Sequence, residues 1–336
     1  MEINHFIGVD VSKGTLDFSL VCKGKSVYYQ KVENSTSGIE SFIKEIKRRF
    51  GFNASTAIFC MEPNGIYNNI LLAFLGKIKA NIWIESALQI KRSQGMARGK
   101  NDKIDSERIA LYAYRYKDNF TSWSPPREII IQIRQLLAIR ASIVEAIKQL
   151  YMPVGKDAEI FFTKSHLKFS RSYCESSIKT MKKDVKAIEK KIKSLIQSDE
   201  TLSRLFKITM SVDGIGLVIA STIIVATNEF KNFSCAKKFA CYSGVVPFEH
   251  SSGTSLKGRT RVSHLANKTV KKMLHLAALI GIRNNGEFKE YYERKIAEGK
   301  HKMSVINAIR NKLVLRIFAC VRENRLFEKK YQFSLA

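Results

Sequence analysis

The stretch His5-Phe6-Ile7-Gly8-Val9-Asp10-Val11-Ser12-Lys13 decides how the first part of this chain folds. Residues 5–11 are nearly all apolar, which is typical of a buried strand, but Asp10 places a carboxylate inside the run. A buried carboxylate is costly unless it has a partner, which can be a cation, a group of hydrogen-bond donors or an arginine. Three further carboxylates lie downstream and favour a cation: Glu62, Asp102 and Asp105.

The composition indicates a basic protein with a polyanionic partner. The chain has 336 residues, with 57 Lys and Arg against 30 Asp and Glu, which gives a formal net charge of +27. Nucleic acid is the first partner to expect, and an anionic membrane surface is the second. No stretch approaches the roughly 18 apolar residues of a membrane span, so we expect no membrane partner. The six cysteines are scattered and form no C-x-x-C pair, which predicts a reduced, cytoplasmic protein.

The first part of the chain predicts a mixed α/β sheet. Three strands in succession are followed by alternating helices and strands, and this order is typical of a sheet covered by helices. The expected strands are 5–11, 15–22, 26–32, 57–62 and 81–85, and the expected helices are 35–50, 66–79 and 104–117. Trp123-Ser124-Pro125-Pro126 breaks the pattern, so we place the end of a first domain at residue 125.

The middle of the chain predicts a helical arm over residues 126–200. Two long helices are expected at 129–151 and 171–197. In the second, apolar residues recur with the 3, 4, 3, 4, 3 spacing of a coiled-coil seam, at Ile178, Met181, Val185, Ile188, Ile192 and Leu195. The arm is either a solvated hairpin or a dimerising element.

Residues 201–336 predict a mainly helical domain with two features that suit phosphate binding. Gly214 and Gly216 lie between two expected helices, and a helix–hairpin–helix can aim backbone N–H groups at a phosphate. A plain tight turn is the alternative. Between Ser251 and Gly286 there are seven basic residues and no acid: Lys257, Arg259, Arg261, Lys268, Lys271, Lys272 and Arg283. We interpret this run as a contact surface for a phosphate backbone, with a solvated basic face as the alternative.

The four carboxylates predict a metal site. Asp10 lies within a strand, Glu62 ends another, and Asp102 and Asp105 share one face at the start of a helix. Carboxylate oxygens are ligands that Mg²⁺ or Mn²⁺ prefers. Two such ions about 4 Å apart can activate a nucleophile and stabilise a leaving oxygen in phosphoryl transfer. The alternative for Asp102 alone is a helix cap.

Particular motifs resemble those of one family. Gly8 to Lys13, Met61-Glu62-Pro63-Asn64-Gly65 and Lys100-Asn101-Asp102-Lys103-Ile104-Asp105 look like the motifs of the DEDD transposases, the insertion-sequence-110 family with its Piv-type DNA invertases. The resemblance covers nearly the whole chain. In the second half it rests on Val212 to Gly216, Phe239 to Pro247 and Ser251 to Arg259.

The resemblance implies a three-part architecture. A RuvC-like domain with an RNase H fold would span residues 1–125, a coiled-coil arm 126–200, and a transposase domain 201–336. The family has a nucleophilic serine before a glycine, and Ser252 stands at that position. It also implies a phosphoserine intermediate, an acidic metal site supplied by another subunit of a homo-oligomer, donor and target DNA as partners, and a structured guide RNA.

The residues alone say less about Ser252. A hydroxyl is a weak nucleophile without a metal or base nearby, and Ser251 and Ser255 are rivals in the same segment. We therefore expect a metal-dependent, serine-using DNA transposase or recombinase. The alternatives are a RuvC-like junction nuclease that uses water, a Piv-type invertase, and a nucleic-acid-binding protein without activity.

Overall fold

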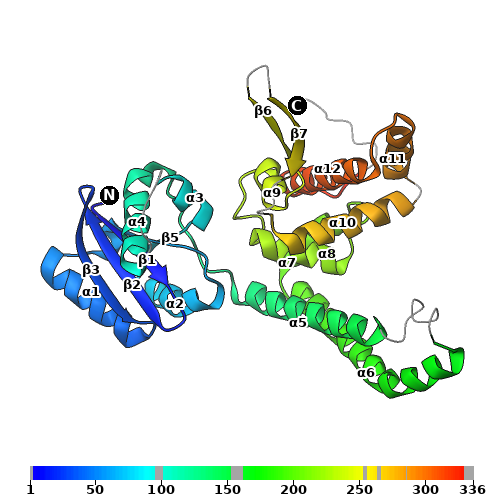
Figure 1. Cartoon of the computed structure of the whole chain (residues 1–336), viewed down its shortest axis with the longest axis horizontal. Coiled ribbons are helices and arrows are strands. Elements are labelled where there is room, and N and C mark those ends of the chain that lie inside the picture. Colours follow the sequence, from blue (N-terminus) through cyan, green and yellow to red (C-terminus); the bar gives the residue numbers. More distant parts are fainter. Residues whose placement is uncertain are drawn as a thin grey trace. The chain divides into compact units, whose positions relative to one another are not determined.

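The computed structural model (Figure 1) describes residues 3–94, 101–152, 162–252, 256–262, 266–284 and 286–328. The chain forms two compact units, Met1–Pro125 and Pro126–Ala336. We describe each unit by itself. Within the described residues, no helix has the length and apolar character needed to cross a membrane. All six cysteines are free thiols.

A five-stranded sheet is the centre of the first unit. Its strands are β1 (His5–Val11), β2 (Thr15–Cys22), β3 (Lys25–Glu33), β4 (Ala57–Met61) and β5 (Asn81–Ile84). The order across the sheet is β3-β2-β1-β4-β5. Strands β1, β2 and β3 are antiparallel neighbours, whereas β4 runs parallel to both β1 and β5. This order and these directions are those of an RNase H-like fold, and they confirm the expected mixed α/β sheet.

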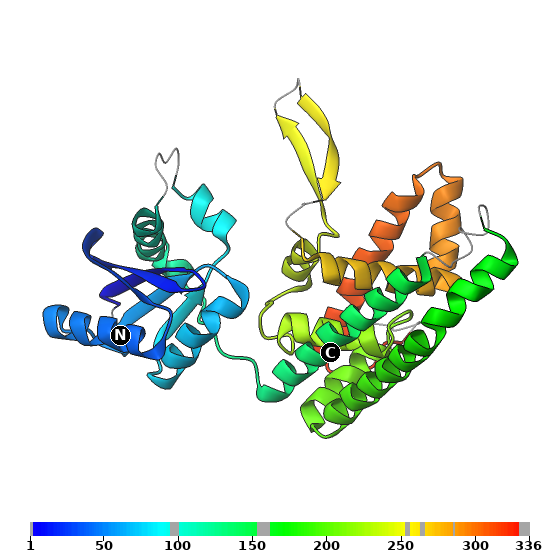
Figure 2. The same ribbon diagram turned by 60° about the horizontal axis from the view of Figure 1, so that its bottom comes forward.

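Helices cover both faces of this sheet (Figure 2). Alternate residues of β1 point to opposite faces, as in any strand. Ile7, Val9 and Val11 pack with α1 (Thr36–Phe50) and α2 (Asn69–Lys77) in one core cluster. On the other face, Phe6 packs with α3 (Ala87–Arg92) and α4 (Asp102–Arg115). Short 3₁₀ turns lie at Ala54–Thr56 (η1), Gly65–Asn68 (η2) and Lys117–Asn119 (η3).

Glycine at position 8 lets α4 lie directly on the sheet. A Cβ atom at Gly8 would lie 2.1 Å from the carbonyl oxygen of Ser106 and 2.2 Å from the backbone nitrogen of Ala110. Those distances are far shorter than a van der Waals contact, so no residue with a side chain fits at position 8. Beside this contact, the buried hydroxyls of Ser19 and Ser106 are hydrogen-bonded at 2.8 Å. The helix that carries two of the four candidate acids is therefore fixed against β1 and β2.

Two predicted helices of the first unit start elsewhere than expected. The helix expected at 66–79 begins as the 3₁₀ turn η2, and α2 proper runs only from Asn69 to Lys77. The helix expected from Ile104 starts at Asp102, because the side chain of Asn101 accepts a hydrogen bond from the backbone N–H of Ile104 at 2.7 Å. Asn101 is therefore the cap, and the alternative that Asp102 serves as the cap is wrong.

The second unit is mostly helical. Its helices are α5 (Glu128–Tyr151), α6 (Lys164–Gln197), α7 (Glu200–Met210), α8 (Leu217–Thr227), α9 (Ala236–Tyr242), α10 (Lys268–Arg283), α11 (Glu287–Ala297) and α12 (Lys302–Arg322). An antiparallel hairpin, β6 (Pro247–Ser252) and β7 (Leu256–Val262), precedes α10. The predicted elements do not include this hairpin, because its sequence is dominated by basic and small polar residues rather than by an alternating apolar pattern.

The first half of α5 packs against the C-terminal part of α6. Ile133 of α5 shares a core cluster with Ile192 of the predicted seam, and Arg140 contacts Glu189 at 2.8 Å. Arg127 lies just before α5 and donates to Asp199 at 2.6 Å, and it also binds Glu229, whose side chain is buried. These two hydrogen bonds raise the pKa of Arg127 well above its usual range. Both helices are thereby attached to the helices that follow them.

We expect Gly8→Ala to destabilise the first unit, because the added methyl must displace the backbone of α4. Overpacking of this kind costs about 1–3 kcal/mol, or more where backbone must move. Both tryptophans, Trp83 and Trp123, lie in this unit, so urea unfolding followed by tryptophan fluorescence measures its stability. Gly14→Ala is the matched control, because nothing lies within 4 Å of its added Cβ. Equal unfolding midpoints for the two variants would contradict the packing argument.

Candidate active site

Asp10 and Glu62 lie beside each other at one edge of the sheet. Strands β1 and β4 are parallel neighbours, with Gly8 opposite Cys60 and Val9 opposite Met61. The next pair in this register is Asp10 and Glu62. Neighbouring strands are about 4.8 Å apart, and both residues fall on the sheet face that α4 covers. Both side chains are half-buried. The sheet thus joins two acids that are 52 positions apart in the sequence.

Helix α4 brings Asp102 and Asp105 toward the same edge. The helix runs opposite to β1, because Phe6 contacts the ring of Tyr114 while Gly8 lies against Ser106 and Ala110. Asp10, which lies further along β1 than Gly8, is therefore on the side of the sheet where the first turn of α4 lies. Asp102 and Asp105 occupy that turn. Asp105 forms an ion pair with Arg108 at 3.2 Å.

Sequence reasoning missed a fifth acid, Asp17, in the same row of the sheet. Asp17 lies directly opposite Asp10 on β2 and opposite Lys31 on β3. Only 2% of its side chain is exposed, and the hydroxyl of Tyr29 donates to it at 2.6 Å. Burial and this hydrogen bond raise the pKa of Tyr29 to about 12. Polar Asp17 and Ser19 interrupt an apolar strand, which is the same signal that singled out Asp10.

Lys31 connects this row to α4. Its ammonium group lies 3.0 Å from Asp102 and 3.4 Å from Asp17. The hydrogen bond to Asp102 is the main cause that raises the pKa of Lys31. Because the side chain of Asp102 is 62% exposed, the pair with Lys31 adds little to stability, but it holds this acid over the sheet edge.

Glu85 is a further acid that sequence reasoning did not consider. It follows β5 directly, and its backbone N–H donates to the carbonyl oxygen of Met61 at 3.0 Å. The hydroxyl of Tyr112 donates to its carboxylate at 3.1 Å. Burial, and then the charges of Glu85 and Glu62, raise the pKa of the Cys60 thiol. Glu62 and Glu85 thus directly follow the last paired residues of two neighbouring strands, Met61 and Ile84.

The chemistry and placement of these acids suit a divalent cation. Asp10, Glu62, Asp102 and Asp105 supply hard oxygen ligands from one edge and one face of the sheet. Within the residues that the structure describes, no three His, Cys, Asp or Glu side chains lie close enough to hold one ion. The four predicted ligands thus lie at one edge of the sheet, but within the described part of the chain no three of them are grouped around one point.

The candidate nucleophile lies in the second unit. Ser252 is the last residue of β6 and is paired in register with Leu256. The hairpin is attached at its base on both sides: Asn307 donates to the carbonyl oxygen of Val245 at 2.7 Å, and Asn267 donates to the hydroxyl of Tyr242, also at 2.7 Å. The side chains of Ser251 and Ser252, and the whole of Ser255, lie outside the described residues.

The basic run divides between the hairpin and α10. Lys257, Arg259 and Arg261 belong to β7, but their side chains are outside the described part of the chain. Lys268 and Lys272 are exposed on the first turns of α10, and Lys271 is half-buried. The first turn of this helix contains no acid. Helix α10 therefore presents positive charge at its positive end.

The turn before α8 has a packing reason for its first glycine. Gly214 has a φ of +86°, and a Cβ there would lie 2.4 Å from the carbonyl oxygen of Ala277 in α10. Gly214 is thus needed for the turn and for close packing on α10. The role of this turn in phosphate binding stays a prediction.

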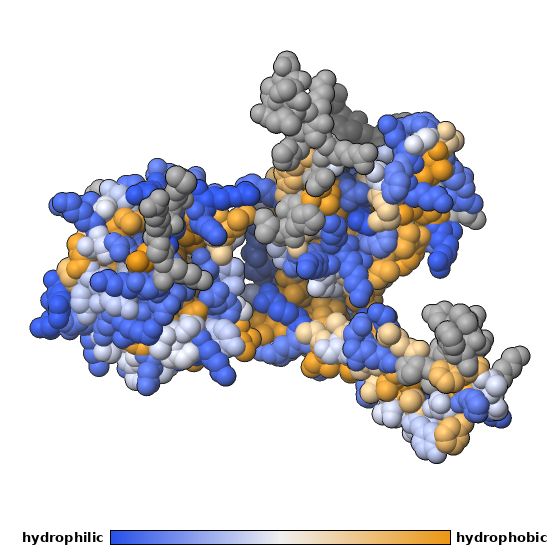
Figure 3. Space-filling model, viewed as in Figure 1, coloured by the Kyte–Doolittle hydropathy of each residue, from blue (hydrophilic) through white to orange (hydrophobic). Residues whose placement is uncertain are grey.

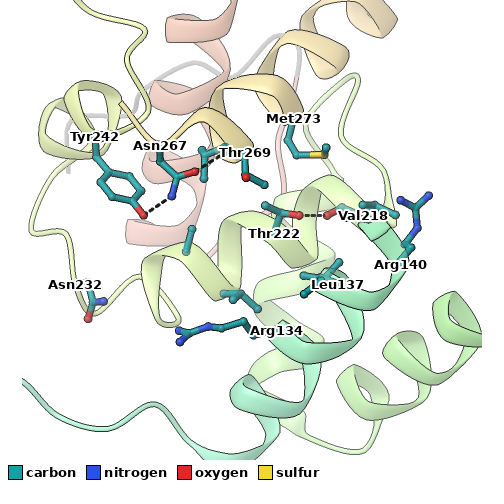
Figure 4. Close-up of a pocket in the computed structure, with 15 residues that line it drawn as sticks. Arg134, Leu137, Arg140, Val218, Thr222, Asn232, Tyr242, Asn267, Thr269 and Met273 are labelled. Carbon is teal, nitrogen blue, oxygen red and sulfur yellow. Dashed lines mark hydrogen bonds between the residues drawn. The ribbon is translucent and has the colours of Figure 1, made fainter. Parts of the chain in front are cut away.

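A cavity of about 560 Å³ lies between α5, α8 and α10 (Figure 4). Much of its lining is apolar, including Leu137, Val218 and Met273. Figure 3 shows apolar surface over these helices, whereas the first unit is mainly hydrophilic on the same face. Several polar groups of the lining bind each other, such as Tyr242 and Asn267. Among the residues that the structure describes, the polar members of the lining are arginine, threonine, asparagine and tyrosine, with no acid, cysteine or histidine.

Comparison with known proteins finds two family models that match the chain, one in its first half and one in its second half. A sequence model described as a transposase, that of the DEDD domain of IS110 elements, matches residues 7–152. A second model, described as the transposase IS116/IS110/IS902 family, matches residues 207–293. The first match contains all four predicted acids, and the second contains Ser252.

Individual relatives agree with this assignment. The pilin gene-inverting protein of Moraxella bovis is 25% identical over 336 residues, which covers 97% of this chain and 98% of the relative. An uncharacterised protein of insertion element IS110 from Streptomyces coelicolor is 27% identical over 127 residues, 38% of this chain and 31% of the relative.

Among solved structures, RuvC of T. thermophilus in complex with Holliday junction substrate is similar over 34% of this chain and 96% of RuvC. The identity is 15% and the TM-score 0.26, and we draw no conclusion from a likeness at that level. The order of the two matched domains and the full-length relative establish the assignment: the chain belongs to the insertion-sequence-110 family of DEDD transposases and Piv-type recombinases, and it is a DNA-cleaving enzyme.

Proposed function

We propose that this enzyme cuts and rejoins DNA through attack of Ser252 on a phosphodiester, assisted by a divalent metal ion. Asp10, Glu62, Asp102 and Asp105 would hold Mg²⁺ or Mn²⁺. The observation that carries the proposal is the parallel register of β1 and β4, whose last pair, Val9 with Met61, is directly followed by Asp10 and Glu62 at the end of the sheet where α4 begins. A metal held there would stabilise charge on the phosphate oxygens and on the leaving oxygen.

The covalent step requires no other reactant. The Ser252 oxygen forms an ester bond to phosphorus while the bond from phosphorus to a DNA oxygen breaks. The proton of the serine hydroxyl is lost, and the departing DNA oxygen takes up a proton as a hydroxyl. Attack of a DNA hydroxyl on the phosphoserine then reverses these changes, joins the new strand and frees the serine. One phosphodiester is lost and one gained.

The partners follow from this chemistry and from the family. Donor and target DNA are the substrates, and the basic residues of β7 and α10 would contact their phosphates. The family resemblance supports a structured guide RNA that pairs with both. It also supports a homo-oligomer, a dimer or tetramer, in which the acids and the serine of one site come from different subunits. We place the reaction in the cytoplasm, with the DNA.

Inversion of a DNA segment is the second candidate. The relative from Moraxella bovis that matches along nearly its whole length is called a pilin gene-inverting protein. Transposition and inversion both need the four acids and Ser252. A RuvC-like junction nuclease that uses water needs the acids alone, so Ser252 separates that third function from the first two.

We expect Asp10→Ala to reduce DNA cleavage to background while DNA binding stays nearly unchanged. The aspartate would hold the metal but contributes no attraction to phosphate. Cleavage of labelled DNA in Mg²⁺, beside a filter-binding titration of the same variant, measures both quantities. Cleavage at the rate of the unaltered protein would remove Asp10 from the metal site.

We expect a covalent protein–DNA adduct that depends on Ser252. The protein is incubated with Mg²⁺, DNA that spans the ends of its own element and the flanking transcript, then denatured and examined for DNA-linked protein. Ser252→Ala should abolish the adduct, whereas Ser251→Ala should retain it. Cleaved DNA without an adduct, at equal rates in all three proteins, would favour the water-using nuclease.

We expect the double variant Lys271→Ala and Lys272→Ala to weaken DNA binding and to flatten its salt dependence. Loss of two phosphate contacts lowers the slope of log K against log salt by about 1.8. The control is Lys44→Ala with Lys47→Ala on α1, two exposed lysines on the sheet face opposite the acids. An unchanged slope in the α10 variant would argue against this surface.

A further inference from the structure

The turn η2 exposes apolar side chains at the edge of the sheet. Ile66 is 74% exposed and Tyr67 is 40% exposed, and Ile70 at the start of α2 is 42% exposed. Leu71 and Leu75 of the same helix are fully buried. The helix therefore already has an apolar face for the core, and the three exposed residues form a second apolar group that faces solvent.

Hydrogen bonds hold this turn in place. The buried side chain of Asn68 donates to the carbonyl oxygen of Glu62 at 2.8 Å and accepts from the backbone N–H of Asn64 at 3.0 Å. Asn64 in turn donates to the carbonyl oxygen of Val11 at 2.6 Å. The exposure of Ile66 and Tyr67 is thus built into the fold rather than a result of fraying.

The same bonds fix the turn beside the candidate metal site. Val11 follows Asp10 on β1, and Glu62 is itself one of the predicted ligands. Asn34 donates both to the carbonyl oxygen of Tyr67, at 3.0 Å, and to that of Ser12, at 2.9 Å. The next residue along, Lys13, is exposed in the turn after β1. We call this group the edge tip: Lys13, Ile66, Tyr67 and Ile70.

We propose that the edge tip contacts unstacked bases of the DNA substrate beside the phosphate that is cut. This inference rests on the proposed function, because DNA must reach Asp10 and Glu62 to be cleaved there. Apolar side chains inserted between bases separate base steps, and aromatic rings stack on freed bases. Lys13 supplies a positive charge for an adjacent phosphate.

A nucleic-acid partner suits the edge tip better than a stable protein interface. Such an interface buries about 1,200–2,000 Å² in total, and three apolar side chains are too few to form its core. The positive charge of Lys13 also complements phosphate. The edge tip thus combines a cation with two apolar residues and one aromatic residue, on turns that are hydrogen-bonded to the backbone of Glu62 and of Val11, the residue after Asp10.

The test uses the full-length chain and DNA that spans the ends of its own element, with 2-aminopurine at bases flanking the cleavage position. Ca²⁺ replaces Mg²⁺ during the fluorescence measurement. We expect 2-aminopurine fluorescence to rise several-fold when the protein binds, because the probe leaves the stack. The double variant Ile66→Ala and Tyr67→Ala should lose this rise and bind at least about five-fold more weakly.

Val27→Ala is the control, because Val27 on β3 is an exposed aliphatic residue, at 42%, that lies outside the edge tip. It should behave like the unaltered protein, and all three proteins should unfold at the same temperature. No rise with the unaltered protein, or an equal rise with the double variant, would overturn the inference. A smaller oligomer in the double variant with an unchanged rise would assign the edge tip to a protein contact instead.

Cleavage in Mg²⁺ on the same DNA separates this inference from the proposed function. Normal cleavage by the unaltered protein with no fluorescence rise would remove only the role of the edge tip. If the unaltered protein raises the 2-aminopurine fluorescence but does not cleave the DNA, the result would count against the proposed chemistry and would still support the contact with bases.

Discussion

The contact between Gly8 and α4 is the constraint on which the candidate active site depends. The backbone of the helix approaches β1 so closely that a single methyl group at position 8 would overlap it. This approach, with the bond between Ser19 and Ser106, fixes how the helix lies on the sheet. Asp102 and Asp105 are thereby directed to the sheet edge where Asp10 and Glu62 end their strands. A close backbone contact in the core thus determines the position of the candidate ligands on α4.

The distribution of charge supports a cation at this edge. The chain as a whole carries a net charge of +27, yet six acids gather around one end of the first sheet: Asp10, Asp17, Glu62, Glu85, Asp102 and Asp105. Placing six like charges together costs free energy, which Lys31, Arg108 and hydrogen bonds such as that from Tyr29 offset. Such costs are typical of functional sites rather than of structural ones.

The proposed reaction draws on residues of both units. The first unit contains the acids, and the second contains Ser252 and the basic helix α10. The hairpin that carries Ser252 is anchored at its base, through Asn307 and Asn267. A serine on such a hairpin can be presented to DNA at a distance from its own core. This arrangement suits a site assembled from separate parts, as the family resemblance implies.

The sequence by itself determined the strands and most helices of the first unit and the family. Apolar runs of period 2 and 3.6 depend on local chemistry, so His5–Val11 and the other strands could be located within one residue. The motifs around Asp10, Glu62 and Asp102 likewise lie in short contiguous stretches. Short stretches also identified Ser252 as a candidate, although its role remains a prediction.

Only the tertiary structure placed Asp17 opposite Asp10, joined Lys31 to Asp102, and set Glu85 beside Glu62. Each of these relations depends on strand register or on how a helix packs on the sheet. Both bring together residues that are far apart in the sequence, so no local pattern of residues encodes them. The exposure of Ile66 and Tyr67 could not be predicted for the same reason. Whether an apolar residue is buried depends on which surfaces the rest of the fold covers.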